Sequence, residues 1–367
     1  MAPTRSLTAL TSIRFLAALR VAIYHLVHWD TTSYWWRGLM ATPASVGYFF
    51  VSSGFLLTYT YAPRFDRGEI SYRKFWLGRA VRLLPIYYLG LLLAFPLLFH
   101  DHVFSFGKTL ATISLLQSWS PGSALYWVYP AWALSNLAFC YFSFPFLLRA
   151  TRSMAARALL ALGALAWFTS LTISFTYVCL NPDGLAVANT STAAFWLYVL
   201  KYNPLIHIPE FLIGVLAGRF FNSRGSLLTA QANSIFVVSS TVILAVLLLG
   251  NIIPYPVTHT GLLAPLLAVF ILSLASGGFA ARALQFKWFV LLGQSSFALY
   301  ILHAPLWDYL QWFFAVSVVT NHGFRLVALA GIVALSVALY QWVEAPLTRA
   351  LRVRLFGPAG NALKSAE

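Results

Sequence analysis

The sequence predicts an all-α, polytopic membrane helix bundle with about ten transmembrane helices. Hydrophobic residues make up 60% of the 367 positions, whereas charged residues make up only 9%. The mean hydropathy is +0.76, and a water-soluble domain cannot hide that much apolar surface. Trp and Tyr, which gather at membrane interfaces, contribute to an aromatic content of 17%. Together these values indicate a protein that crosses the bilayer many times.

Long apolar stretches recur along the chain, and a spanning helix needs about 20 mostly apolar residues. The longest interruption, from His100 to Tyr126, is itself partly apolar. We therefore expect a single transmembrane domain over residues 1–355 and a short, disordered cytoplasmic tail over residues 356–367. The predicted spans are residues 12–29, 43–62, 83–99, 126–148, 156–179, 195–218, 233–253, 260–277, 288–316 and 323–343.

The basic residues concentrate on one side of the predicted spans. The opposite loops hold only Arg37, Lys108 and Arg325 of the 24 Lys and Arg residues. Because cytoplasmic loops carry the excess of positive charge, both termini are predicted to be cytoplasmic, as in a multi-pass protein of the cell's inner (cytoplasmic) membrane. The net charge of +15 forms no basic amphipathic helix or groove, so it indicates contact with membrane lipids and not with nucleic acid.

The first predicted span contains "IRFLAALRVAIYHLVHW", which carries several ionisable groups. Arg14 and His25 are eleven positions apart, so both lie on one helical face, about 16 Å apart along the axis. Ionisable residues inside a membrane usually face the bundle interior or a water-filled cavity. An interhelical hydrogen bond that satisfies His25 is an open alternative. His25 and His28 have the spacing of a metal pair, but no third ligand is evident nearby, and no metal is expected.

The third span is preceded by the basic run "YRKFWLGRAVRLLPIYY". Arg79 and Arg82 are three positions apart on one helical face, and Arg73 and Lys74 come a turn or two earlier. A convergent pair of guanidinium groups suits a phosphate ligand, because arginine can bind phosphate through two parallel hydrogen bonds. Charge that sets the topology, or that contacts lipid headgroups, is the open alternative.

A series of short motifs follows the chain from its first span to its last. An Arg-x10-His pair, Arg14 and His25, is followed by "FFVSSGF", "RKFWLGRAVRLLP", "PAWALSNLAFCY", "GQSSFALYILHAP" and "VEAPL". This series, in this order over nearly the whole chain, resembles the acyltransferase 3 family of integral-membrane O-acyltransferases.

The resemblance implies an enzyme that takes an acyl group, usually acetyl, from cytoplasmic acyl-CoA. The acceptor would be a hydroxyl of a glycan, a cell-envelope polymer or a small molecule. His25 matches the family's general base and Arg14 its arginine, whereas Arg79 and Arg82 are expected at the CoA phosphates. A hydroxyl is a poor nucleophile until a base takes its proton, and a neutral histidine can do so within about 3 Å.

Other polar residues fall within or near these motifs. Ser296, Tyr300 and His303 share one helical face, as a polar seam along a donor or acceptor path would. Ordinary helix packing and interhelical hydrogen bonding are the alternatives. The candidates for a supporting role or for an acceptor path are Ser53, Trp132, Ser135, Tyr300, His303, Glu210 and Glu344.

The chain departs from the family where the pattern W-S-L-S-x-E is common. Residues 132–137 read "WALSNL", so Leu137 stands in place of a carboxylate. Glu210 or Glu344 would have to replace it, and a charge partner at a helix end is the simpler interpretation of each. Without the extracytoplasmic SGNH domain of some relatives, transfer is expected to finish within the bundle or on a separate extracytoplasmic partner.

Two other functions remain open from the sequence. One is a transporter or flippase of a lipid-linked or amphipathic substrate, with His25, Glu210 and Asp308 as a proton relay, although the two halves show no clear internal repeat. The other is a catalytically weakened, acyltransferase-like scaffold, which Leu137 would explain.

Overall fold

The computed structural model describes residues 7–27, 42–101, 103–186, 188, 192–250 and 252–357. These ranges fold almost entirely into helices and contain no β-strand. His28 and the predicted tail from residue 358 onward lie outside them. The predicted all-α class is confirmed.

The long helices follow the ten predicted spans, and shorter helices and turns join them. The long helices are α1 (Thr8–Leu26), α3 (Pro43–Asp66), α4 (Tyr72–His100), α6 (Trp132–Thr151), α7 (Ala156–Leu180), α9 (Pro204–Arg224), α10 (Ala232–Leu248), α12 (Ala264–Ser276), α14 (Lys287–Phe313) and α16 (His322–Leu339). The shorter elements are α5 (Phe106–Ile113), η1 (Gln117–Trp119), η2 (Tyr129–Ala131), α8 (Phe195–Tyr202), η3 (Gly225–Gln231), α11 (Tyr255–His259), α13 (Phe279–Ala283), α15 (Val316–Val319), the π-helical turn η4 (Tyr340–Glu344) and α17 (Ala345–Phe356).

Eight stretches of the described chain are long and apolar enough to cross a membrane. One of them, Phe195–Leu248, contains two predicted spans, because α8, α9, η3 and α10 follow one another closely. Helix α3 is not among the eight, since its Ser, Thr and Tyr residues lower its hydropathy, yet most of its residues are buried in the bundle. The prediction of a polytopic bundle is confirmed.

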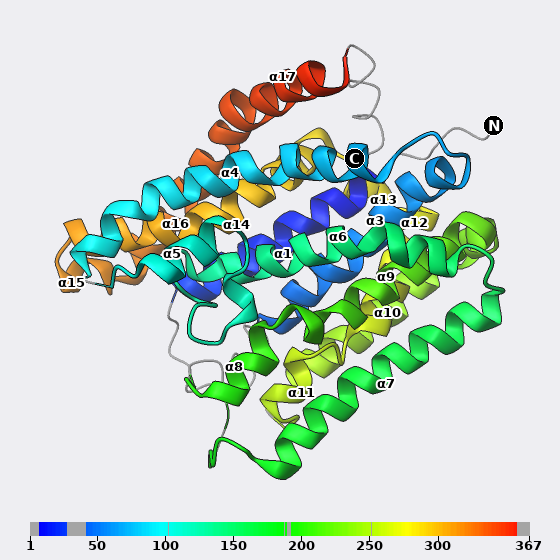
Figure 1. Cartoon of the computed structure of the whole chain (residues 1–367), viewed down its shortest axis with the longest axis horizontal. Helices are drawn as coiled ribbons and strands as arrows, with labels where there is room; N and C mark the ends of the chain where they lie inside the picture. The colour runs from blue at the N-terminus through cyan, green and yellow to red at the C-terminus, as the bar shows by residue number, and fades with distance from the viewer. Residues whose placement is uncertain are drawn as a thin grey trace.

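Helix α1 occupies the middle of the bundle in Figure 1, while α7 and α17 lie at opposite edges. It packs against α14 and α3. A Cβ atom on Gly293 of α14 would lie 2.3 Å from the carbonyl oxygen of Thr11, so only glycine permits this close approach. Two hydrogen bonds fix α1 further: Tyr48 Oη donates to the Leu10 carbonyl at 2.9 Å and Ser12 Oγ to the Leu284 carbonyl at 2.7 Å.

Helices α3 and α9 also meet through glycine. A Cβ atom on Gly54 would lie 2.2 Å from the Phe211 carbonyl oxygen, and one on Gly214 would lie 2.1 Å from the Val51 carbonyl oxygen. Lipid tails are as apolar as leucine side chains, so helices in a bilayer associate through close packing of this kind. The small residues of these two helices therefore stabilise the pair.

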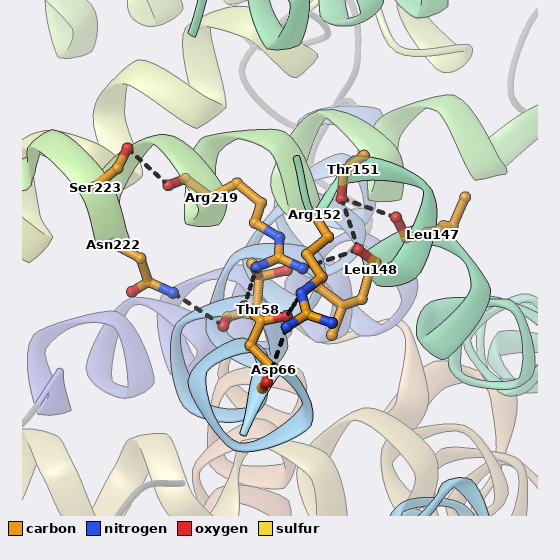
Figure 2. Close-up of polar contacts among 9 residues, drawn as sticks. All are labelled: Thr58, Asp66, Leu147, Leu148, Thr151, Arg152, Arg219, Asn222 and Ser223. Atoms are coloured by element: carbon orange, nitrogen blue, oxygen red, sulfur yellow. Dashed lines mark hydrogen bonds and ion pairs between the residues drawn. The ribbon is translucent and has the colours of Figure 1, made fainter. Parts of the chain in front are cut away.

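Figure 2 shows a polar contact that joins the ends of α3, α6 and α9. Arg219 donates to the Asp66 carboxylate at 2.7 Å and to the Leu148 carbonyl at 2.8 Å. Arg152 Nε lies 3.5 Å from the same carboxylate. We call this end of the bundle, which also contains the first turns of α1 and α4, the basic end. Its arginines on α6 and α9 bind helix ends together.

The α3–α9 contact predicts a specific loss of stability. Gly214→Ala places a methyl group against the Val51 backbone, and overpacking of this kind costs about 1 to 3 kcal/mol. We expect a lower unfolding temperature for this variant in detergent. Gly331→Ala, in exposed helix α16 with no atom within 4 Å of the new methyl group, is the matched control. Equal unfolding temperatures for the two variants would contradict this account of the packing.

Candidate active site

The structure brings together two histidines that are far apart in the sequence. His25 lies in the last turn of α1, and His303 lies in the middle of α14. Nδ1 of His25 is 2.8 Å from Nε2 of His303, and the two rings are nearly parallel. His303 is fully buried, whereas His25 is partly exposed. The interhelical hydrogen bond that the sequence left open for His25 is therefore present, and its partner is the second candidate histidine.

The hydrogen bonds assign the ring protons of the neutral pair. Nδ1 of His303 lies 3.0 Å from the Leu299 carbonyl oxygen, which can only accept, so this nitrogen carries the proton. Nε2 of neutral His303 is then an acceptor, and His25 donates to it through Nδ1. The basic lone pair of neutral His25 is consequently on Nε2. A general base oriented by a second group in this way is a recurring arrangement in enzymes.

A cavity of about 180 Å³ opens near the basic end of the bundle. It collects arginines from three helices: Arg14 from α1, Arg79 and Arg82 from α4, and Arg349 and Arg352 from α17. Of the described residues that line it, none is acidic. The three arginines that the sequence predicts near the acyl donor, Arg14, Arg79 and Arg82, therefore line one cavity.

Deeper in the same cavity, the lining becomes mixed polar and apolar. Ser53, Ser296 and Tyr300 line it together with several leucines. Ser53 is buried, and its hydroxyl has no hydrogen-bond partner within the described ranges. The Tyr300 ring centroid is 6.2 Å from that of His303, so the cavity reaches the neighbourhood of the histidine pair.

Two of the cavity arginines have fixed orientations. Arg79 donates to Tyr61 Oη at 2.9 Å and lies over the Tyr61 ring. Arg82 Nη1 lies 2.6 Å from Oε1 of Glu344, whose side chain is fully buried. Glu344 is thus a charge partner at a helix junction, which is the simpler of the two interpretations that the sequence allowed.

Leu137 lines this cavity as well. An apolar side chain therefore faces the space where the family pattern has a carboxylate. Two candidates from the same motif are turned elsewhere: Ser135 Oγ donates to the Leu115 carbonyl at 2.6 Å, and Trp132 packs against His207 and Tyr202. Trp132 and Ser135 do not line the cavity.

Glu210 belongs to a separate buried cluster. Its Oε1 is 3.4 Å from Nδ1 of His207, and Nε2 of His207 donates to the Lys201 carbonyl at 2.8 Å. The Lys201 ammonium lies between 5.2 and 5.6 Å from the ring centroids of Tyr198, Tyr202 and Tyr255. His207 and Glu210 have the i, i+3 spacing of one helical face. The cluster as a whole was missed at the level of sequence, because its other members come from α8 and α11 and only the packing of the helices brings the three elements together.

Arg73 and Lys74 lie in the first turn of α4 and are exposed. Neither lines the cavity that Arg79 and Arg82 line. The structure therefore separates the four basic residues of this run into two groups. Arg349 and Arg352 line the cavity instead. The sequence had placed them only among the basic residues of the cytoplasmic side.

A second cavity, of about 710 Å³, lies at the opposite end of the bundle. Tyr126, Trp127 and Tyr129 line it together with Asp101 and Asp308. The Tyr129 ring stands edge-on to His25, with ring centroids 4.8 Å apart. The histidine pair itself lines neither cavity, but it contacts Tyr300, which lines the first, and Tyr129, which lines the second.

The described residues contain no group of three or more His, Cys, Asp and Glu side chains that could hold a metal ion.

Comparison with known proteins gives one result. A family model described as an acyltransferase domain, that of the acyltransferase 3 family, matches residues 7–341. No curated protein and no solved structure matches the chain. The match extends from the start of α1 into η4 and ends before α17.

Proposed function

Because this chain belongs to the acyltransferase 3 family and is a membrane acyltransferase, we propose that its donor is acyl-CoA and its acceptor a hydroxyl group. The acyl group is acetyl in the simplest case, and the acceptor is a glycan, a cell-envelope polymer or a small molecule. The observation that carries the proposal is the histidine pair between a basic cavity and a second cavity.

The basic cavity suits the donor. CoA is anionic at its nucleotide end and carries the thioester on a long arm, and guanidinium groups bind phosphate well. The cavity has arginines at its mouth and reaches Tyr300 beside the histidine pair. From the positive-inside rule we infer that the basic end faces the cytoplasm, where acyl-CoA is available. This arrangement supports entry of the donor from the inner side of the cell's cytoplasmic membrane.

The histidine pair suits the transfer step. The acceptor oxygen attacks the thioester carbonyl carbon while Nε2 of His25 takes the hydroxyl proton. A C–O bond forms, the C–S bond breaks, and the CoA thiolate leaves as a thiol with the proton that His25 returns. His303 is a positioning residue, because it holds Nδ1 of His25 through the 2.8 Å hydrogen bond. Arg14 contacts the donor from the cavity wall.

The second cavity suits the acceptor. Aromatic walls with a few polar groups are typical of sites for sugars and small molecules. Tyr126, Trp127 and Tyr129 provide such walls, and Asp101 and Asp308 provide hydrogen-bond acceptors for hydroxyl groups. In this proposal Asp308 binds the acceptor. A proton relay through Asp308, His25 and Glu210 would have to connect separate sites, because Glu210 lies beside His207. A separate extracytoplasmic partner is not required by this arrangement.

A catalytically weakened enzyme is the second candidate, and Leu137 in the cavity wall is the observation that favours it. A carboxylate at this position would face the arginines of the cavity. In the proposed mechanism that carboxylate is dispensable, because His303 orients His25. The two candidate functions therefore predict different effects of a carboxylate at position 137 on the rate of acyl transfer.

Donor binding tests the proposal without knowledge of the acceptor. We expect the double variant Arg79→Ala/Arg82→Ala to bind acetyl-CoA at least about tenfold more weakly than the wild type, a loss of about 1.4 kcal/mol. Calorimetry on the detergent-purified protein measures it. Arg73→Ala/Lys74→Ala is the matched control, because it removes the same charge from the same helix outside the cavity. Equal losses in the two double variants would contradict the donor site, and a folded wild type that does not bind would contradict the proposed donor.

Leu137→Glu separates the two candidates. The new carboxylate would oppose the anionic donor in the basic cavity, so we expect weaker acetyl-CoA binding and no gain in transfer. Transfer to water, followed as release of free CoA thiol, provides the measurement. Leu137→Gln controls for polarity, and His25→Asn gives the background rate. A His25-dependent gain of about tenfold or more, specific to the glutamate variant, would instead show that the wild type is a weakened enzyme.

A further inference from the structure

The mouth of the basic cavity is completed by α17, which lies beyond the residues that the family model matches. Figure 1 shows α17 at the edge of the bundle, above α4 in this view, and the two helices are in contact. The π-helical turn η4 precedes α17, and π-helical turns are rare and frequently mark functional sites. Glu344, at the end of η4, binds Arg82 of α4 and so fixes where α17 begins.

One face of α17 lines the cavity. Ala345, Thr348, Arg349 and Arg352 lie on it, at the spacing of successive helical turns. Arg352 is only 5% exposed, whereas Arg354, two positions further along and on another face, is exposed and does not line the cavity. The helix therefore presents two of its three arginines to the same space as Arg79 and Arg82.

Positive charge is concentrated around this cavity. Arg352 is buried beside a cavity that also holds the cations Arg79 and Arg82, and like charges close together repel most strongly where water is excluded. Among the described residues, Glu344 contributes a carboxylate to this region, and it lies against Arg82. An anionic ligand that enters the cavity would offset the repulsion.

Thr348 provides a second, independent indication. Its side chain is 8% exposed and lines the cavity, and its hydroxyl has no hydrogen-bond partner in the part of the chain that the structure describes. An unsatisfied buried hydroxyl costs about 1 to 3 kcal/mol. A ligand oxygen in the cavity would accept a hydrogen bond from it. A phosphate group has several such oxygens, and its negative charge is attracted by the neighbouring arginines.

We propose that α17 is a phosphate-binding arm of the donor site, in which Thr348, Arg349 and Arg352 bind phosphate groups of the CoA nucleotide. This inference rests on the proposed function. The phosphate of a lipid headgroup has the same chemistry and could reach a basic helix at the membrane surface. The burial of Arg352 inside the cavity favours the nucleotide, because a lipid headgroup would meet the exposed face of α17.

The test compares Arg352→Gln with Arg354→Gln, which removes the same charge from the same helix. Each variant is titrated in phosphatidylcholine nanodiscs with acetyl-CoA and with S-acetylpantetheine, which lacks the nucleotide. We expect Arg352→Gln to weaken acetyl-CoA binding about tenfold or more and to leave S-acetylpantetheine binding unchanged. Arg354→Gln should change neither. Arg349→Gln, at an exposed position that does not threaten folding, should also weaken acetyl-CoA binding.

Equal acetyl-CoA affinities of Arg349→Gln, Arg352→Gln and Arg354→Gln, in a protein whose wild type binds, would overturn the role of α17 and leave the proposed function intact. A wild type that does not bind acetyl-CoA would overturn both. The lipid source is tested by adding phosphatidylglycerol to the nanodiscs. If phosphatidylglycerol stabilises the wild type against unfolding, and Arg352→Gln removes that stabilisation but leaves the acetyl-CoA affinity unchanged, then the phosphate that α17 binds belongs to a lipid. That result would overturn the proposal that α17 binds CoA.

Discussion

The hydrogen bond between His25 and His303 is the contact on which the arrangement of the site depends. It exists because α1 and α14 approach closely, which Gly293 permits by leaving room for the Thr11 backbone. The bond from His303 to the Leu299 carbonyl then determines which nitrogen of each ring holds the proton. A packing constraint between two helices thereby sets the tautomer of His25, the base in the proposed mechanism.

The charged groups of the basic end divide into two sets with different roles. Asp66 neutralises Arg219 and Arg152 and joins the ends of three helices, as Figure 2 shows. Arg79 and Arg82 instead line a cavity whose described lining residues include no acid, although Glu344, outside the lining, pairs with Arg82. Ionisable groups within a bilayer are costly and usually face the bundle interior or a water-filled cavity, as these arginines do.

The sequence predicts much of this, because helix length, charge asymmetry and motif order are local properties. The spacing of residues within single helices predicts the spans and the all-α class. It also predicts that Arg79 and Arg82 face the same cavity. The contact between His25 and His303 does not, because it joins two helices 278 positions apart. The sequence also grouped Arg73 and Lys74 with Arg79 and Arg82, because all four lie close together on one helix, although only the last two line the cavity. It did not predict that Arg352 lines the cavity, because that depends on how α17 packs against the bundle.

The ring proton of His25 tests the central claim most directly. Nitrogen-15 NMR on histidine-labelled protein reports the tautomer of each neutral ring, and His25→Asn identifies the His25 signal. The account predicts a proton on Nδ1 of His25 in the wild type, and a mixture of tautomers in His303→Leu, which removes the acceptor. A proton on Nε2 in the wild type, or an unchanged His25 signal in His303→Leu, would contradict a base that His303 orients.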